Sequence, residues 1–404
     1  MLDSSMAEGL VDVKGAGVCA IDAHSVYIHI PFCVRKCAYC DFLSFPNCVS
    51  RIDEYVEALC QEISLAPKLW GNEIKPLLRT IYFGGGTPSL LSGKQVAEIL
   101  LALKSGFDLS EDCEITLEAN PGTIDAQKLC AFYDAGINRI SLGIQSLDDS
   151  VLRTLGRIHD ADTARKAIDM VQEAGFRNIS CDMMLGIPGQ TLESVKATVG
   201  ELLERGIPHV SLYSLILEEG TPMYARYGGD IEKYVTQEAD REMYHEVIRS
   251  LTAKGYTHYE ISNMARAGYE SRHNMMYWRA EQYYGFGVGA HYYLGQERGR
   301  HAETLEEYLT ALGETNVRRE DVYFPEETLT REDCMKEFMI LGFRMGSGVD
   351  ARMFQERFGM TVESAFAKEL EQEQAKGLVV AEEGAYRLTE KGFDLANQVF
   401  MDYV

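Results

Sequence analysis

Predicted strands and helices alternate through the first half of the chain, and this alternation limits the fold more than any other feature. Six short runs rich in β-branched and apolar residues predict strands at residues 25–30, 80–83, 114–118, 139–143, 178–184 and 209–215. Segments between them, at 95–103, 126–135, 161–174 and 192–204, repeat apolar residues at the helical spacing. After the first unit the strands recur about every 30 residues, the length of one strand–helix step. The pattern predicts parallel strands with helices outside, either an open doubly wound sheet or a partial barrel.

The pattern changes near residue 320. Before that point, a helix at 237–254 and a strand at 256–261 extend the first domain. Beyond it, helices are predicted at 331–341, 351–358 and 362–376, followed by short strands at 378–381 and 385–388 around Gly384. Helices followed by such a β-hairpin are typical of a winged-helix module. We therefore expect an N-terminal extension at 1–24, an α/β barrel with its extension at 25–320, and a smaller helical, winged-helix-like domain at 321–404.

The charge balance excludes one class of partner. The chain has 39 Lys and Arg against 62 Asp and Glu, a formal net charge of −23. Such a surface repels phosphate backbones, so nucleic acid is not an expected partner. Residues 327–404 carry 9 basic and 15 acidic side chains, a net charge of −6. The winged-helix-like part is therefore not expected to bind DNA.

The sequence gives no sign of a membrane or secretory route. No apolar run approaches the ~18 residues needed to cross a bilayer. The first 23 residues carry one Lys and four acidic side chains, unlike the basic and then apolar start of a signal peptide. We expect a cytoplasmic protein that is not an integral membrane protein. In that compartment the ten cysteines are expected to be thiols, with any tight cluster binding metal.

Three cysteines are tightly clustered directly after the first predicted strand. Cys33, Cys37 and Cys40 lie within eight residues, in the spacing CxxxCxxC. Three thiolates this close can bind one metal centre, and soft sulfur ligands select iron–sulfur, zinc or copper(I). Structural zinc normally requires four ligands, and the nearest further thiol is that of Cys48.

Polar and glycine residues mark the ends of the next strands. Phe83-Gly-Gly-Gly-Thr-Pro88 follows the second strand, where glycines let the backbone approach a ligand and leave N–H groups free. Glu118 ends the third strand, Gln145 ends the fourth, and Asp182 lies in the fifth. Carboxylates and amides at a barrel mouth can hold ribose hydroxyls or an ammonium group. Taken one at a time, each is equally consistent with a cap or a structural hydrogen bond.

These motifs, in this order, resemble the radical S-adenosylmethionine (SAM) superfamily over most of the chain. The resemblance implies a partial (β/α)6 TIM-like barrel in which Cys33, Cys37 and Cys40 bind three irons of a [4Fe–4S] cluster. The fourth iron stays open for the amino and carboxylate groups of SAM, so a fourth cysteine is not required. The resemblance further implies SAM contacts at Tyr27, Tyr39, Gly85, Gly86, Thr87, Glu118, Gln145, Arg157 and Asp182.

Within that superfamily the chain looks like the HemN-like family and, in particular, its HemW branch of heme chaperones. His273-Asn-Met-Met-Tyr277-Trp278 is similar to the HNxxYW motif of that branch. The resemblance implies a heme site at His273, Tyr277 and Trp278, and delivery of heme to acceptor proteins, among them respiratory-chain proteins. An imidazole ligand and aromatic side chains suit heme chemically. His29, His159 and His291 compete with His273 as the axial ligand, and a buried histidine in an aromatic core is the alternative interpretation of the motif.

Three further hypotheses share the cluster and SAM residues. The first is oxygen-independent coproporphyrinogen III oxidase, the second another radical SAM enzyme that cleaves SAM to 5′-deoxyadenosine, and the third a binding module in which the cluster serves only assembly. The oxidases of the family carry a fourth cysteine two residues after the third, where this chain has Asp41-Phe42. The chain also lacks their long N-terminal arm. Oxidase activity is therefore not expected, and no catalytic side chain is assigned.

Overall fold

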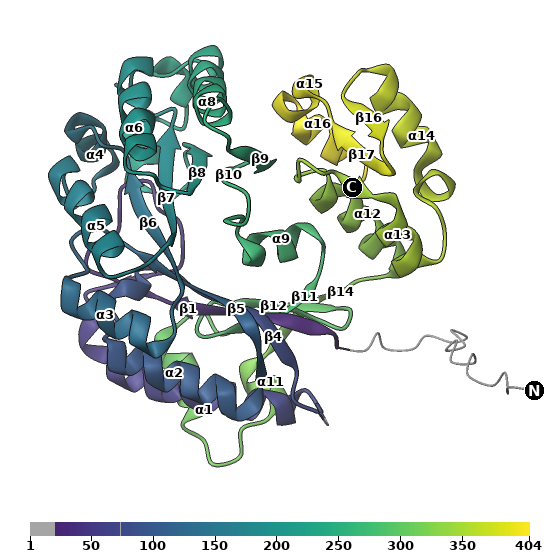
Figure 1. The fold of residues 1–404 in the computed structure, drawn as a ribbon. Coiled ribbons are helices and arrows are strands. Elements are labelled where there is room, and N and C mark those ends of the chain that lie inside the picture. The colour runs from purple at the N-terminus through teal and green to yellow at the C-terminus, as the bar shows by residue number, and fades with distance from the viewer. Residues whose placement is uncertain (1–20, 73) are drawn as a thin grey trace, which may run out of the picture.

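One large sheet organises the molecule. The computed structural model describes residues 21–72 and 74–404, so most of the expected N-terminal extension, residues 1–24, lies outside the described chain. Within the described chain, a twelve-stranded sheet has the order β14-β13-β12-β11-β1-β4-β5-β6-β7-β8-β10-β9 (Figure 1). Its central strands are β1 (Ala23–Ile30), β4 (Leu77–Gly85), β5 (Asp108–Ala119), β6 (Arg139–Gln145), β7 (Asn178–Leu185) and β8 (His209–Ser214).

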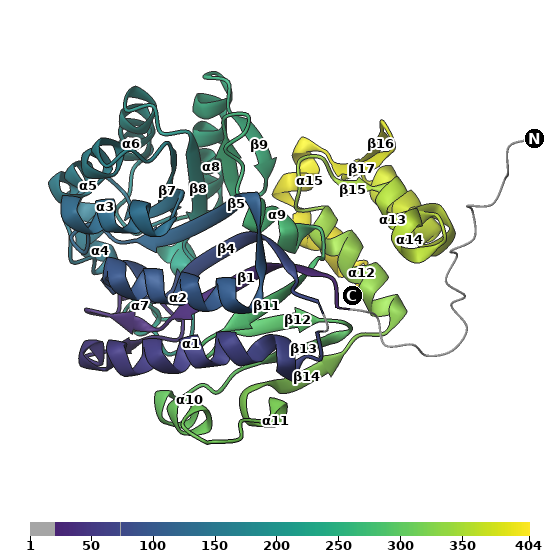
Figure 2. The ribbon, with the colours of Figure 1, turned by 60° about the horizontal axis from the view of Figure 1, so that its bottom comes forward.

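These six strands are parallel and lie side by side in the order of the sequence. Their connections therefore all run in the same direction around the sheet, and the helices lie on one side of it (Figures 1 and 2). The helices are α1 (Ile52–Leu69), α2 (Gly93–Gly106), α3 (Ala126–Ala135), α4 (Asp149–Leu155), α5 (Ala161–Glu173), α6 (Leu192–Glu204), α7 (Pro222–Tyr227) and α8 (Gln237–Thr252). This arrangement decides between the two predicted architectures: the fold is a partial barrel and not a doubly wound sheet.

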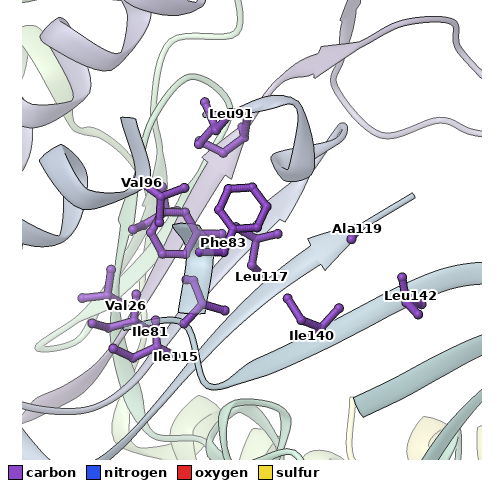
Figure 3. Close-up of a cluster of buried hydrophobic side chains, with 14 of the residues drawn as sticks. Val26, Ile81, Phe83, Leu91, Val96, Ile115, Leu117, Ala119, Ile140 and Leu142 are labelled. Carbon is purple, nitrogen blue, oxygen red and sulfur yellow. The ribbon is translucent and has the colours of Figure 1, made fainter. Parts of the chain in front are cut away.

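The alternation of side chains along each strand separates an apolar outer face from a polar inner face. Figure 3 shows part of the outer face, where Ile81, Phe83, Ile115, Leu117 and Ile140 are buried with residues of α2. Burying one such side chain contributes about 1.5–3 kcal/mol. The residues between them in sequence, such as Glu118 and Ser141, point to the concave side. The sequence therefore builds a hydrophobic wall outside and leaves a polar surface inside.

Local signals fix where the helices begin and end. Ser92 and Gln95 form a capping box at the start of α2, and Asp125 caps α3 through the amide of Lys128. Gly136 ends α3 in the left-handed region, at φ 115°, which glycine adopts without a steric penalty.

Antiparallel strands complete both margins of the sheet. On one side, β10 (Asn263–Ala265) pairs with β8, and β9 (Thr257–Glu260) is the outermost strand. On the other side, β11 (Gln282–Phe286) runs parallel to β1 and continues into the antiparallel strands β12 (His291–Leu294), β13 (Glu297–Arg300) and β14 (Phe324–Thr328). Short helices α10 (Leu305–Leu312) and α11 (Arg319–Val322) lie between β13 and β14. The sequence places the start of the second part at residue 321, but β14 at 324–328 pairs with β13 of the large sheet.

The C-terminal part is winged-helix-like, as predicted. It contains α12 (Arg331–Gly342), β15 (Val349–Asp350), α13 (Ala351–Phe358), α14 (Val362–Ala375), β16 (Val379–Glu382), β17 (Ala385–Leu388), α15 (Glu390–Asp394) and α16 (Ala396–Met401). Its strands form a separate sheet, β15-β17-β16, and it has its own core around Phe338, Met339 and Phe354.

Several contacts hold the C-terminal part against the barrel, and two of them involve α8 and β9. Asp394 forms ion pairs with Arg241 and His245 of α8. Glu260 of β9 forms an isolated antiparallel bridge with Met345. Between the two parts lies a short helix, α9 (Arg272–Trp278), on the concave side of the sheet (Figures 1 and 2). In the described chain, no helix is both long enough and apolar enough to pass through a bilayer.

Candidate functional site

A cavity of about 390 Å³ opens on the concave face of the barrel, at the carboxyl ends of the parallel strands. This is where parallel α/β folds place their ligands, and the volume is in the usual range for ligand pockets. All three clustered cysteines line it. So do eight of the nine residues expected to contact SAM, namely Tyr39, Gly85, Gly86, Thr87, Glu118, Gln145, Arg157 and Asp182.

The cysteine loop leaves β1 and is held against the barrel by backbone hydrogen bonds. The amide of Ala38 donates to the carbonyl of Leu155 at 3.2 Å, and the carbonyl of Ala38 accepts from the amide of Met223 at 2.9 Å. Cys33 is buried, and its Sγ lies 3.5 Å from Oγ1 of Thr87. These contacts fix the loop that carries the three thiols.

Burial raises the pKa of the Cys40 thiol to about 11, and the neighbouring Cys37 and Cys33 contribute to this rise. Across the residues that the structure describes, no three His, Cys, Asp or Glu side chains are grouped closely enough for a single metal ion. A cluster of several irons makes a different demand, because each cysteine binds its own iron. Three thiols that line one cavity fit that donor set.

Arg157 connects the cysteine loop to the strand ends. Its Nη1 donates to Sγ of Cys37 at 3.4 Å, and its Nη2 donates to the carbonyl of Gly143 at 2.7 Å and to Oδ1 of Asn120. Asn120 in turn donates from Nδ2 to Oγ1 of Thr87 at 3.0 Å. The guanidinium therefore places a positive charge beside one of the three clustered thiols. One chain of hydrogen bonds therefore joins Cys37 to Thr87.

The glycine loop after β4 is shaped by close contact with β1. Gly85 has φ +111°, and a Cβ there would lie 2.6 Å from Cε1 of His29. A Cβ on Gly86 would lie 2.7 Å from the carbonyl oxygen of Phe32. Neither position has room for a side chain, so both glycines are required by packing as well as by any ligand.

Two buried carboxylates stand in the wall of the cavity. Burial raises the pKa of Glu118 to about 7, and the nearby Asp182 adds to the rise, while a hydrogen bond from Tyr82 at 2.8 Å opposes it. Burial also raises the pKa of Asp182, whose carboxylate accepts hydrogen bonds from Ser141 at 3.1 and 3.2 Å. Carboxylates with shifted pKa values in a cavity are typical of functional sites.

Gln145 and Tyr27 differ in their relation to the cavity. Gln145 lines it with φ 63°, a conformation that non-glycine residues rarely adopt and that is often found at ligand sites. Tyr27 does not line it: its ring stacks on that of Tyr82, with centroids 6.3 Å apart, and its hydroxyl bonds Nδ1 of His29 at 3.0 Å. Tyr27 therefore lies behind the cavity wall.

His273, on α9, does not line this cavity. It is buried, its Nδ1 bonds Oγ1 of Thr80 at 2.8 Å, and its Nε2 bonds the hydroxyl of Tyr277 at 3.1 Å. Burial lowers its pKa to about 3, with a further contribution from the charge of Arg139, so the ring is neutral. The ring also stacks on Tyr82, with centroids 5.0 Å apart. Its neighbour Asn274, and not His273, reaches the cavity wall.

The other residues expected at heme have separate surroundings. Tyr277 contacts His273 edge-on, with ring centroids 5.0 Å apart, and Trp278 lies under the guanidinium of Arg344, 4.2 Å from its ring centroid. His29 and His159 are buried and each bonds a backbone carbonyl, of Leu43 at 2.9 Å and of Ile144 at 3.2 Å.

His291 is exposed and lies 3.9 Å from a carboxylate oxygen of Glu326. His209 is the histidine that lines the cavity within the described residues.

Several residues of the cavity were not expected from the sequence. They are Tyr82, Asn120, Arg139, Ser141, His209, Ser211 and Asn274. Some of them lie an even number of residues from an expected one, as Asn120 follows Glu118 by two and Ser141 precedes Gln145 by four. For these residues the period of two along a strand was a signal that could have found them. His209, Ser211 and Asn274 come from elements with no expected SAM contact.

The barrel and the C-terminal part match two different protein-family models. Residues 27–202 match the family model of the radical SAM superfamily, and residues 329–395 match that of the HemN C-terminal domain. A Lactococcus lactis protein named heme chaperone HemW is 37% identical over 381 residues, which are 94% of this chain and 97% of the relative. A Bacillus subtilis protein of the same name is 38% identical over 380 residues, 93% of this chain and 98% of the relative.

Among solved structures, coproporphyrinogen III oxidase (HemN) from Escherichia coli, a radical SAM enzyme, has a similar fold. The TM-score is 0.79, and the match covers 95% of this chain and 90% of that chain at 23% identity. At this identity the likeness concerns the fold alone.

Proposed function

Because this chain belongs to the HemW family of the radical SAM superfamily, we propose that it binds heme and delivers it to acceptor proteins in the cytoplasm. The observation that carries the proposal is the match to heme chaperones over nearly the whole chain, 94% of it in one case. The oxidase alternative is not favoured, since its support is a similar fold at 23% identity.

Superfamily membership implies a [4Fe–4S] cluster and SAM, and the cavity supports both. Cys33, Cys37 and Cys40 would hold the cluster, with the guanidinium of Arg157 beside Cys37. When bound and reduced, a cluster of this class supplies the electron that cleaves SAM.

The chain's own residues would bind and orient SAM. The loop at Gly85 and Gly86 has no side chains and so lets a ligand approach the backbone, although the amide of Gly86 already donates to the carbonyl of Ile30 at 2.9 Å. Thr87 offers a hydroxyl held by Asn120. Glu118 and Asp182 offer buried oxygens that can accept hydrogen bonds from ribose hydroxyls or from an ammonium group. Both carboxylates already accept hydrogen bonds from neighbouring hydroxyls, which fix their orientation before a ligand arrives.

The heme site is proposed at His273, Tyr277 and Trp278, from the motif. Both ring nitrogens of His273 have hydrogen-bond partners, in Thr80 and Tyr277. A bond from this imidazole to iron therefore requires one of the two partners to move. Nε2 is the candidate, because Tyr277 lies one turn along the same short helix and Thr80 lies inside the sheet.

The test uses purified full-length protein with the cluster reconstituted under anaerobic conditions. Hemin is titrated while the Soret band is recorded, and coproporphyrinogen III with SAM and a reductant is supplied to a parallel sample. We expect a saturable Soret shift near one heme per chain and no protoporphyrinogen. Absence of a shift would remove the chaperone assignment, and formation of protoporphyrinogen would favour the oxidase.

A further inference from the structure

Arg139, the first residue of β6, is buried in the cavity wall with 2% of its surface exposed. Its Nε has no hydrogen-bond partner, and no ion pair or hydrogen bond joins its guanidinium to any residue of the described chain. Burying a charged group costs several kcal/mol unless it is paired and hydrogen-bonded. A guanidinium in a cavity wall with unused donors is therefore poised to bind an anion.

The nearby carboxylates do not use these donors. Arg139 is close enough to lower the pKa of Glu118, yet burial is the larger effect, and the pKa of Glu118 stays raised at about 7. Glu118 accepts its hydrogen bond from Tyr82, and Asp182 accepts from Ser141. Arg139 is thus a positive charge near these carboxylates but donates no hydrogen bond to them. Its donors are therefore free for a ligand.

Arg139 lies deeper in the barrel than the residues expected to hold SAM. In the register of the sheet, Glu118 faces Ser141, and Arg139 is two residues earlier on the same face of β6. Two residues of a strand span about 7 Å. Thr87, whose hydroxyl contacts Cys33, lies beyond the carboxyl end of β4 and so at the other end of the cavity. An anion at Arg139 therefore belongs to a molecule other than the SAM bound beside the cysteines.

Asn274 lines the same cavity from α9, which lies on the concave side of the sheet. Arg139 is in register with Thr116 of β5, and Thr116 with Tyr82 of β4, whose ring stacks on His273 of α9. The first residue of β6 therefore lies at the same level of the sheet as this helix. An amide N–H and a guanidinium together are suitable donors for a carboxylate.

We infer that Arg139 and Asn274 form a carboxylate subsite at the floor of the cavity, and that it takes a propionate of the bound porphyrin. The inference rests on the proposed function, because it names the part of heme that this site recognises. It also gives α9 two separate tasks: Asn274 contacts the ligand's carboxylate, and His273 is the candidate for its iron.

The test compares hemin with hemin dimethyl ester, which has the same ring and iron but no free carboxylate. Affinities are measured for the wild type and for Arg139→Gln, Arg139→Lys and Asn274→Asp, in cluster-loaded full-length protein. We expect the wild type to bind hemin at least about tenfold more tightly than the ester, as one charge-assisted hydrogen bond predicts. Arg139→Gln should reduce that ratio to about one, and Arg139→Lys should keep part of it. Asn274→Asp places a negative charge beside the propionate and should weaken hemin but not the ester.

The results distinguish failure of the carboxylate subsite from failure of the proposed function. If the wild type binds both porphyrins equally, or if Arg139→Gln and Asn274→Asp both keep the preference for hemin, the subsite is wrong and the proposed function stands. If Arg139→Gln loses affinity for SAM and keeps its preference for hemin, Arg139 binds SAM and the inference is overturned. If the wild type binds neither porphyrin, the proposed function fails and the subsite falls with it. Should Arg139→Gln fail to fold, judged by its cluster content, Asn274→Asp decides alone.

Discussion

The guanidinium of Arg157 lies 3.4 Å from the sulfur of Cys37, and the same group bonds the carbonyl of Gly143 at the end of β6. The loop that carries the cysteines is thus tied through one side chain to the strand end that carries Gln145. This link places a positive charge next to a thiol that must lose its proton to bind iron.

The first prediction concerns the three cysteines. Cys33→Ala, Cys37→Ala and Cys40→Ala should each lose the cluster, because each removes one of three protein ligands. The matched controls are Cys48→Ala and Cys113→Ala, which should keep it. Iron and sulfide counts after anaerobic reconstitution measure the result, and a full cluster in Cys37→Ala would contradict the assignment.

The second prediction concerns pH and Glu118. Its pKa of about 7 lies above the 4.5 of an exposed Glu, so between these values the folded protein binds more protons than the unfolded chain. Glu118 therefore lowers the free energy of unfolding as the pH rises through this window. SAM affinity, in contrast, should increase as the pH rises, because the ionised carboxylate of Glu118 is the better hydrogen-bond acceptor. A ligand that binds only the ionised form would gain up to about tenfold between pH 6 and pH 8.

Isothermal titration at several pH values measures this effect, with Glu118→Gln as the comparison. The variant should bind SAM more weakly at pH 8 and show a flatter profile. An equally steep profile in Glu118→Gln would assign the titration to another group.

The third prediction concerns the glycine loop. Gly85→Ala should destabilise the fold by about 1–3 kcal/mol, because its Cβ would collide with His29 and its φ is positive. The matched control is Gly200→Ala in α6, where a Cβ meets nothing within 4 Å. Alanine in a helix is favoured over glycine by up to about 1 kcal/mol, so the control should be stabilised. Thermal unfolding of the two variants gives the comparison, and equal midpoints would show that the loop yields without strain.

The fourth prediction concerns heme and His273. His273→Ala should weaken heme binding and alter the Soret spectrum, since an imidazole–iron bond contributes to both. Tyr277→Ala and Trp278→Ala should lower affinity by less, on the order of 1–3 kcal/mol each, without changing the ligand. Thr80→Val is the structural control, because it removes a hydrogen bond from His273 and keeps the ring.

Cluster content separates a heme effect from a folding effect in these variants. Loss of heme with the cluster retained would support a ligand role. A wild-type spectrum and affinity in His273→Ala would leave His273 as a core residue.

Most of the fold could be predicted from the sequence, because apolar residues recur clearly with the period of two in the strands and of about 3.6 in the helices. Alternation along 139–145 directs Arg139 and Ser141 to the cavity side and Ile140 and Leu142 to the apolar outer side, as a strand with one polar face requires. Strand order could not be obtained this way, because an open doubly wound sheet and a partial barrel have the same local pattern. The place of β14 was also hidden: Phe324–Thr328 is exposed throughout and has no apolar alternation.

For the site, the sequence indicated the residues at the strand ends but not the orientation of His273. Motifs at strand ends identified Gly85, Glu118 and Asp182, because parallel strands bring their carboxyl ends together whatever their order. The direction of His273 depends on how α9 is seated, and this depends on contacts distant in sequence. The amides of Arg272 and His273 donate to the carboxylate of Glu114, at 3.2 and 3.1 Å. No local pattern contains that pairing.

The two margins of the large sheet protect the protein from aggregation in different ways. An edge strand with free backbone groups can recruit a strand from another molecule. On one margin, β14 carries Pro325, Glu326 and Glu327, and proline and repeated charge oppose such pairing. On the other margin, β9 is shielded by the bridge between Glu260 and Met345 of the C-terminal part. The winged-helix-like part thus blocks the unpaired edge of β9. A barrel expressed without it should assemble into oligomers through this strand.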